Sequence, residues 1–324
     1  MSGAGWLLRR LLAAALLIWA AASLVFLLAQ AAPGDLLASL GGDHQSEASR
    51  AALSEALALD RSPSERYRDW LLQLSRGDLG RAASHGRPVI EVLAERLPVS
   101  LAIALPALVL ATALGLAWAL VAGAHPGWAR AGTALALVCG AAPVFWLAFA
   151  LVQWFSIQLG WLPIQGLEDA RSQASGWALT LERARHLVLP VSAVALHQFG
   201  LFFLMARAHL SLEWRQDHCR TALAKGHGHG AALVRHALPA AAAPLIALLG
   251  HRIGHLLTAT ALVEVCFGLP GMGRLLIDAT LARDHVLVLG AFLSIVALAV
   301  LGNLLADLVS RRLDPRLSLG GGIE

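Results

Sequence analysis

Long uncharged apolar runs dominate the sequence and predict helices that span a membrane. Bilayer hydrocarbon is about 30 Å thick, so a spanning helix needs about 20 mostly apolar residues. Five such runs contain no Asp, Glu, Lys or Arg, and a sixth is interrupted only by Arg252. Because backbone polar groups find no water in the bilayer core, each run is expected to be a helix. Internal prolines such as Pro106 and Pro143 are expected to kink these helices rather than end them. The six runs are 11–34, 97–129, 131–167, 186–206, 239–263 and 285–306.

Polar segments between these runs divide the chain. A long polar region follows the first run, and a basic segment separates the fourth run from the fifth. We therefore expect an all-α integral membrane protein with six transmembrane helices and a small external domain between helices one and two. The expected parts are an N-terminal segment with the first helix at 1–31, an extracytoplasmic domain at 32–96, a five-helix core at 97–310 that contains a cytoplasmic loop at 209–239, and a cytoplasmic tail at 311–324.

Composition and charge support this organisation. Charged residues make up 14% of the chain, whereas an ordinary soluble domain is about 25% charged. Arg9 and Arg10 precede the first run, which places the N-terminus in the cytoplasm under the positive-inside rule. This run is longer than the apolar region of a signal peptide, so we expect it to be retained. The net charge of +4 is spread over several loops, so membrane topology explains it better than binding to nucleic acid.

The expected external domain contains a clear helix start. Ser62, Pro63 and Glu65 combine a capping box with a proline at the first helical position. Apolar residues follow at helical spacing from Trp70 onward. A second short amphipathic helix is expected at 46–59.

Residue patterns for nucleotide hydrolysis, catalysis and metal binding are absent from the sequence. A P-loop needs a lysine after glycine to reach the phosphates, but the only lysine, Lys225, follows Ala224. The three cysteines are far apart and odd in number, so they form neither a disulfide framework nor a metal cluster. We therefore expect no catalytic residue, metal or cofactor on this chain, and any ATP that drives it must bind another subunit.

The segment between the fourth and fifth runs resembles a known loop. Residues 217–239 read DHCRTALAKGHGHGAALVRHALP. They are similar to the EAA loop of ABC importer permeases, in which a glycine is followed by nine residues and an ending like I-x-L-P. Here Arg220-Thr221-Ala222 stands in place of Glu-Ala-Ala, and Gly226 is the motif glycine. The RTALAKG form resembles the dipeptide/oligopeptide/nickel permease family, first-permease type. Further segments resemble that family in the same order: APGD at 32–35, GDLG at 77–80, ERLP at 95–98, QLGWLP at 158–163, PGMGR at 270–274 and LDPR at 313–316.

The resemblance implies a fold, partners and a location. It implies the type I ABC importer permease fold in the bacterial inner membrane, with cytoplasmic termini and lipid around the helices. The chain would form half of the translocation path for dipeptides or oligopeptides. A second homologous permease would form the other half, two cytoplasmic ATPases would hold ATP and Mg, and an extracytoplasmic solute-binding protein would deliver the substrate.

The resemblance also implies a set of ATPase-coupling residues. A short helix in the loop is expected to dock in a groove of the ATPase, with Ala222 and Leu223 making the contacts. Gly226 is expected to need a conformation, or a close approach, that a Cβ would spoil. Because glycine disfavours helices, the docking helix is expected to fray near Gly228. The implied coupling residues are Arg220, Thr221, Ala222, Leu223, Lys225, Gly226, Leu238 and Pro239.

Polar residues inside the runs are candidates for the translocation path. An arginine at a helix centre costs about 2.5–3.5 kcal/mol on the insertion scale, so Arg252 should face protein or water. His251, His255 and Thr258 are spaced to share one helix face, which Arg252 flanks. The alternative to a path is a set of interhelical hydrogen bonds. The candidates are His197, His251, Arg252, His255 and Thr258. Glu264, near the end of the fifth run, is expected to pack against the loop at 267–274.

Other functions remain open at this point. Import of nickel or a metal chelate by the same machinery is the alternative for the substrate. A secondary transporter working alone is a second alternative, although no Asp or Glu lies deep in the runs to bind a coupling ion.

Overall fold

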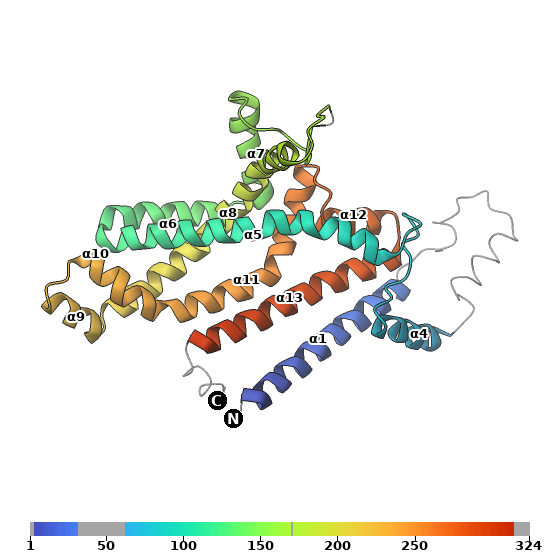
Figure 1. Ribbon diagram of the computed structural model, residues 1–324, viewed down its shortest axis with the longest axis horizontal. Helices are drawn as coiled ribbons and strands as arrows, with labels where there is room; N and C mark the ends of the chain where they lie inside the picture. Colours follow the sequence, from blue (N-terminus) through green and yellow to red (C-terminus); the bar gives the residue numbers. More distant parts are fainter. Residues whose placement is uncertain (1–2, 32–61, 170, 314–324) are drawn as a thin grey trace, which may run out of the picture. The chain divides into compact units, whose positions relative to one another are not determined.

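The computed structural model describes residues 3–31, 62–169 and 171–313, and every regular element among them is a helix (Figure 1). The amphipathic helix expected at 46–59 lies outside these residues. The described chain forms two compact units, one from Met1–Pro98 with Arg274–Val300 and one from Val99–Gly273 with Leu301–Glu324. The elements in order are α1 (Gly3–Ala31), α4 (Pro63–Ser75), α5 (Val89–Ala124), α6 (Pro126–Ala141), α7 (Val144–Leu151), η1 (Val152–Gln158), α8 (Trp177–Trp214), α9 (Asp217–Ala224), α10 (His229–Ala232), η2 (Leu233–Ala237), α11 (Leu238–Cys266), α12 (Met272–Leu281) and α13 (His285–Leu313).

The helices account for the predicted membrane spans. Four helices in the described part are long and apolar enough to cross a bilayer, and two bent helix pairs raise the number to as many as six. The all-α membrane fold expected from the sequence is therefore confirmed. The four helices cover residues 8–27, 89–124, 177–214 and 285–309, and the bent pairs cover 127–141 with 144–158 and 229–242 with 244–250.

The third predicted span is broken rather than kinked. The chain turns by 105° between α6 and the helix that begins at Val144. Ala142 has an extended backbone with φ −69° and ψ 131°, and Pro143 follows with ψ 139°. A proline ring crowds the residue before it out of the helical region, so α6 ends at Ala141. The expectation of a kink at Pro143 is therefore wrong, whereas Pro106 does lie inside the continuous helix α5.

In the first unit, α1 and α4 pack through aromatic side chains. The predicted capping box is confirmed, because the Glu65 backbone N–H donates to Ser62 Oγ and the Ser62 N–H donates to the Glu65 carboxylate. The helix that this cap begins places Tyr67 and Trp70 against Phe26 of α1, with ring centroids 5.3 and 5.2 Å away.

The start of α13 is also held by a cap in this unit. Asp284 is buried and accepts hydrogen bonds from the backbone N–H and the hydroxyl of Ser84, at 2.8 and 2.7 Å. Its second oxygen accepts from the Leu287 N–H at 3.1 Å, as an N-cap residue does. Asp284 thus ties the turn before α5 to the start of α13.

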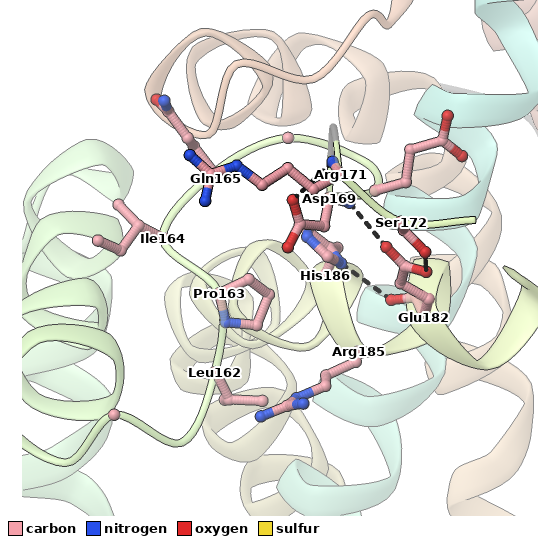
Figure 2. A pocket seen from close by; sticks show the side chains of 13 residues that line it. Leu162, Pro163, Ile164, Gln165, Asp169, Arg171, Ser172, Glu182, Arg185 and His186 are labelled. Carbon is pink, nitrogen blue, oxygen red and sulfur yellow. Dashed lines mark hydrogen bonds between the residues drawn. The ribbon is translucent and has the colours of Figure 1, made fainter. Parts of the chain in front are cut away.

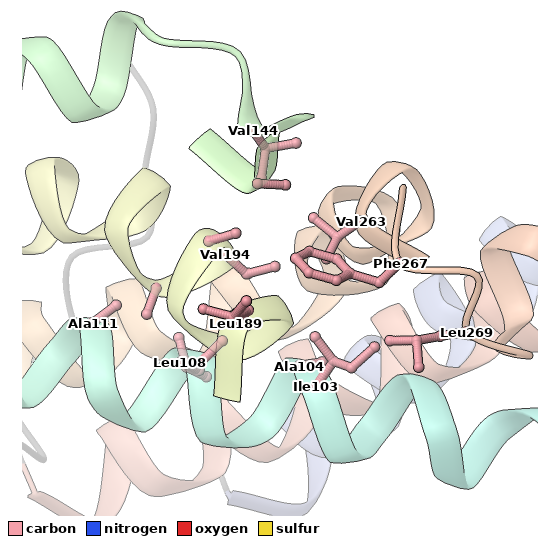
Figure 3. Close-up of a cluster of buried hydrophobic side chains, with 14 of the residues drawn as sticks. Ile103, Ala104, Leu108, Ala111, Val144, Leu189, Val194, Val263, Phe267 and Leu269 are labelled. Carbon is pink, nitrogen blue, oxygen red and sulfur yellow. The ribbon is translucent and has the colours of Figure 1, made fainter. Parts of the chain in front are cut away.

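In the second unit, α8 lies at the centre and contacts α6, α7 and α11. Close helix packing depends on small residues, as in other membrane bundles. A Cβ on Gly200 would clash with the Ala136 backbone of α6, and one on Gly115 would meet the backbone of Phe203. A buried apolar cluster joins α5, α7, α8 and α11 (Figure 3). It includes Ile103, Leu108, Val144, Leu189, Val194, Val263, Phe267 and Leu269.

The loop after α11 is locked by a buried carboxylate. Glu264 is fully buried and accepts from the Ser100 hydroxyl at 2.6 Å and from the Gly273 N–H at 2.8 Å. Ser100 in turn accepts from the Met272 N–H at 2.8 Å. A Cβ on Gly271 would collide with the Glu264 carboxylate. The expectation that Glu264 packs against the loop at 267–274 is confirmed, whereas its contact with Ser100 was not predicted.

Candidate functional site

The first candidate site is the loop between α8 and α11, where helix α9 ends in a Schellman motif. The Gly226 N–H donates to the Leu223 carbonyl at 2.9 Å, and the His227 N–H donates to the Ala222 carbonyl at 3.2 Å. Gly226 has φ +87°, the left-handed conformation that this motif requires. A Cβ there would meet no atom of this chain within 4 Å. Within the chain, the glycine is therefore needed for its backbone conformation rather than for a close approach.

Helix α9 turns one face into the protein and the other outward. Cys219 and Ala222 are buried, and Cys219 belongs to the same apolar cluster as Leu210 and Leu233. Burial raises the pKa of the Cys219 thiol. Leu223 is 40% exposed and thus available for a partner. The expectation that Ala222 also contacts a partner is wrong, because its side chain is covered by this chain itself.

The polar residues of α9 are exposed and act locally. The Arg220 guanidinium lies 3.6 Å from the Asp217 carboxylate, and the Thr221 hydroxyl donates to the Asp217 carbonyl at 2.8 Å. Both side chains are highly exposed in the Arg220–Asp217 pair, so it contributes little stability. The outward face of α9 therefore presents Arg220, Leu223 and Lys225 without strong ties to the rest of the chain.

After the glycine turn the chain returns toward α11. The docking helix ends at Ala224, earlier than the fraying expected near Gly228, and Gly228 instead precedes α10. The turn at 233–237 is widened into a π-helix just before Pro239, which is near the start of α11. Proline lacks an N–H and crowds the carbonyl four residues earlier, and a widened turn accommodates both effects. Leu238 packs against the same cluster as Cys219.

The candidate path residues occupy two helices. His197 Nδ1 lies 3.2 Å from the Ala142 carbonyl, so the imidazole donates to a group exposed by the break before α7. Arg252 is half-buried on α11. His251, His255 and Thr258 lie on the same helix, but their side chains are outside the described part of the structure. The hydrogen bond of His197 favours the structural alternative for that residue.

The fifth span bends near its start, at Pro244. The chain turns by 52° between the helical segments that end at residue 242 and begin at Pro244. Between α5, α8 and α11, a small apolar cavity of about 280 Å³ lies beside this bend and is lined by Leu116, Phe202, Leu245 and Leu249 among others.

A second candidate site is a cavity of about 950 Å³ formed by the loop after η1 and the start of α8 (Figure 2). Glu182 organises its polar wall, because its carboxylate accepts from the Asp169 N–H at 2.7 Å and from the Ser172 hydroxyl. His186 Nδ1 bonds to the Glu182 carbonyl at 3.0 Å. Figure 2 shows Leu162 and Pro163 on the opposite side. The cavity thus pairs a charged wall with an apolar one.

Sequence reasoning did not find this cavity. The third apolar run extends to residue 167, so the first part of this loop was expected to be helical, although three glycines break the segment up. Gly160, Gly166 and Gly176 all have positive φ, at 65°, 85° and 58°. Such glycines mark a loop with several sharp turns, which was the available signal for an irregular structure that encloses space.

Comparison with known proteins gives a consistent result. Residues 111–319 match the family model described as binding-protein-dependent transport system inner membrane component. A putative peptide transport system permease protein of Brucella abortus is 35% identical over 298 residues, which cover 91% of this chain and 93% of the relative. The oligopeptide transport system permease protein AppB of Bacillus subtilis is 28% identical, with 97% and 99% covered. The di/tripeptide transport system permease protein DppB of Pseudomonas aeruginosa is 28% identical, with 91% and 93% covered.

Proposed function

The chain belongs to the family of binding-protein-dependent transport system inner membrane components, and on this premise we propose that it is one permease half of an ATP-driven peptide importer. The similarity to peptide permeases along nearly the full chain carries this proposal. The membrane helices and the family identify a transport subunit rather than a hydrolase. Under the proposal, the half-path accepts dipeptides or oligopeptides that a solute-binding protein delivers.

The proposed orientation places both termini and the α9–α10 loop in the cytoplasm. Arg9 and Arg10 before the first span support it, because positive charge favours the cytoplasmic side. The broken pair α6–α7 is then a single span, and the loop that holds the 950 Å³ cavity lies outside. In that position the cavity is available to the solute-binding protein, and its mixed charged and apolar walls suit a protein surface.

The proposed coupling element is α9 with its glycine turn. Two cytoplasmic ATPases, which hold ATP and Mg, would contact the exposed face of α9 through Leu223, Arg220 and Lys225. The buried face, with Cys219 and Ala222, ties α9 to the apolar cluster beneath it. Movement of the ATPase would then pass through a rigid element into the helices of this chain and a second, homologous permease.

Uptake by intact cells tests the substrate. Disruption of the gene for this chain should abolish uptake of labelled dipeptides and tripeptides, and the wild-type gene should restore it. Uptake of the free amino acid is the control and should not change. Normal peptide uptake together with lost uptake of nickel or a metal chelate would replace the peptide assignment by the metal alternative.

A further inference from the structure

A small basic cavity lies where the ends of three helices meet in the second unit. It has a volume of about 250 Å³ and is enclosed by the end of α5, the start of α6, the end of α8 and one residue of η2. Two arginines, Arg207 and Arg215, are the only charged groups among its ten lining residues. This cavity is separate from the 950 Å³ cavity near the start of α8 and from the exposed face of α9.

One face of α8 supplies its polar wall. Residues 207, 210, 211, 214 and 215 all line the cavity, and their spacing places them within one helix face. Arg207 and Arg215 are two turns apart, about 12 Å along the axis. Arg215 is the residue that follows α8, and its side chain lines the same cavity as that of Arg207. Ser211 lies between them, and its hydroxyl donates to the Ala208 carbonyl at 2.8 Å.

The facing wall is made of small residues, which leaves room for a ligand. Ala119, Ala122 and Gly123 of α5 and Ala129 of α6 line it. Leu233 closes one end and lies so near Gly123 that an added Cβ would be 3.0 Å from it. The cavity is thus bordered by small residues of α5 and α6 and by Leu233, with the arginine side chains as its charged features.

The charge of the two arginines is not balanced by acidic side chains within the described residues. The Arg207 guanidinium has one hydrogen-bond partner there, the neutral Thr133 hydroxyl at 2.6 Å. Arg215 is exposed, and its side chain makes no ion pair in the described part. The nearest carboxylate on α8, that of Glu213, lies on another face and is 3.8 Å from His218. Two guanidinium groups directed into one cavity favour an anionic ligand with several oxygens, such as phosphate.

The residues around this basic cavity are typical of a membrane–water interface. The apolar run of α8 ends at residue 206, directly before Arg207. The Trp118 indole N–H donates to the Trp128 carbonyl at 3.1 Å, and Trp128 is 53% exposed. Tryptophan is enriched at this level of the bilayer. Val121 and Leu212, next to lining residues, are also about half exposed, so acyl chains can lie along the same helix ends.

From this arrangement we propose that the cavity binds the phosphate of an anionic phospholipid headgroup. Arg207 and Arg215 bind the phosphate oxygens, and the exposed apolar residues contact the acyl chains. Basic pockets between membrane helices bind such headgroups by the same chemistry. Because η2 borders the cavity, a bound lipid would also support the base of the α9–α10 loop.

Native mass spectrometry of the purified full chain tests this site. The chain is equilibrated with an equimolar mixture of phosphatidylglycerol and phosphatidylcholine in detergent, and the bound lipid is identified by mass. Wild type should retain phosphatidylglycerol preferentially. Arg207→Gln and Arg215→Gln should each weaken that binding about fivefold, and the double variant about thirtyfold. The double lysine variant, R207K/R215K, should largely retain it.

Three controls separate the proposal from its competitors. Arg130→Gln removes an exposed arginine of α6 that does not line the cavity and should leave binding unchanged. Inorganic phosphate and glycerol 3-phosphate, added without lipid, report a site for soluble phosphate. Co-purification of the ATPase reports whether the arginines instead bind that subunit. If the double glutamine variant does not remain monodisperse, Arg215→Gln alone decides, because its side chain is exposed.

Several results would overturn the lipid site. One is equal retention of phosphatidylglycerol and phosphatidylcholine by wild type. A second is a loss of phosphatidylglycerol binding in Arg130→Gln as large as that in Arg207→Gln or Arg215→Gln. A third is binding of soluble phosphate as tight as that of phosphatidylglycerol. Loss of the ATPase in Arg215→Gln with unchanged lipid binding would assign the arginines to the subunit interface instead.

Discussion

Replacement of Gly226 by alanine isolates the role of the glycine turn in coupling. Gly226 has φ +87° and accounts for the two hydrogen bonds that end α9. A Cβ at this position meets no atom of the chain within 4 Å, so the cost of alanine comes from the backbone alone. The left-handed conformation costs an ordinary residue about 1–2 kcal/mol. This lowers the ratio of the native turn to alternative conformations roughly 5- to 30-fold.

Gly228 provides a matched control two residues away. It has φ −63° and ψ 155°, which any residue adopts, and a Cβ there also meets nothing within 4 Å. Gly228→Ala should therefore cost less than Gly226→Ala, because alanine adopts this conformation without strain and loses only the modest preference for glycine at the N-cap of α10. Gly226→Val should be worse than Gly226→Ala, since a β-branched residue tolerates positive φ poorly.

The assay is ATP-driven peptide uptake in proteoliposomes that contain both permeases and the ATPases. Peptide transported per ATP hydrolysed should fall in Gly226→Ala and fall further in Gly226→Val, with Gly228→Ala like wild type. Co-purification of the ATPase with each variant shows whether docking or the later coupling step is lost. Equal uptake and equal ATPase retention in Gly226→Ala and Gly228→Ala would refute the assignment of α9 as the coupling element.

Three further predictions concern topology, energy use and stability. A thiol reagent that cannot cross the membrane should label Ser64→Cys from outside and Gly228→Cys only from the cytoplasmic side. Cys219 should stay unlabelled in both cases, because it is buried and the pKa of its thiol is raised. Labelling of Gly228→Cys from outside would reverse the topology. The purified chain without its partners should hydrolyse no ATP, and turnover that survives removal of every ATPase contaminant would contradict this. Glu264→Ala should lower the thermal unfolding midpoint in detergent, because it leaves buried donors unpaired at about 1–3 kcal/mol each. Glu168→Ala, which removes only an exposed pair with Arg183, should change the midpoint little.

Local features of the sequence were sufficient for the apolar helices, apart from the break in the third span, and for the ends of several helices. Apolar runs of this length have no stable state other than helices in a bilayer, so their positions could be predicted without any tertiary contact. The cap at Ser62 and the turn at Gly226 were also predictable, because their hydrogen bonds join residues only a few positions apart. These signals depend on backbone chemistry that neighbouring helices do not alter.

The direction in which side chains face depended on tertiary structure. Ala222 was expected to face a partner but is buried, because the cluster around Cys219 determines which side of α9 turns inward. His197 reaches a carbonyl that is available only because the chain turns by 105° before α7. Residue types alone do not specify that angle, since Pro106 sits inside a continuous helix.

Contacts between distant segments were the least predictable. Glu264 bonds to Ser100 across 164 residues, and the basic cavity needs the ends of α5, α6 and α8 together. Hydrophobic periodicity tells which residues avoid water. In a bilayer most faces of a helix are apolar, so this periodicity does not tell which neighbouring helix each face meets. That choice is made by packing, by small residues such as Gly200 against Ala136 and by the pairing of buried polar groups. The sequence thus determined the helices and their caps, whereas only the folded chain decided which polar groups came together to form sites.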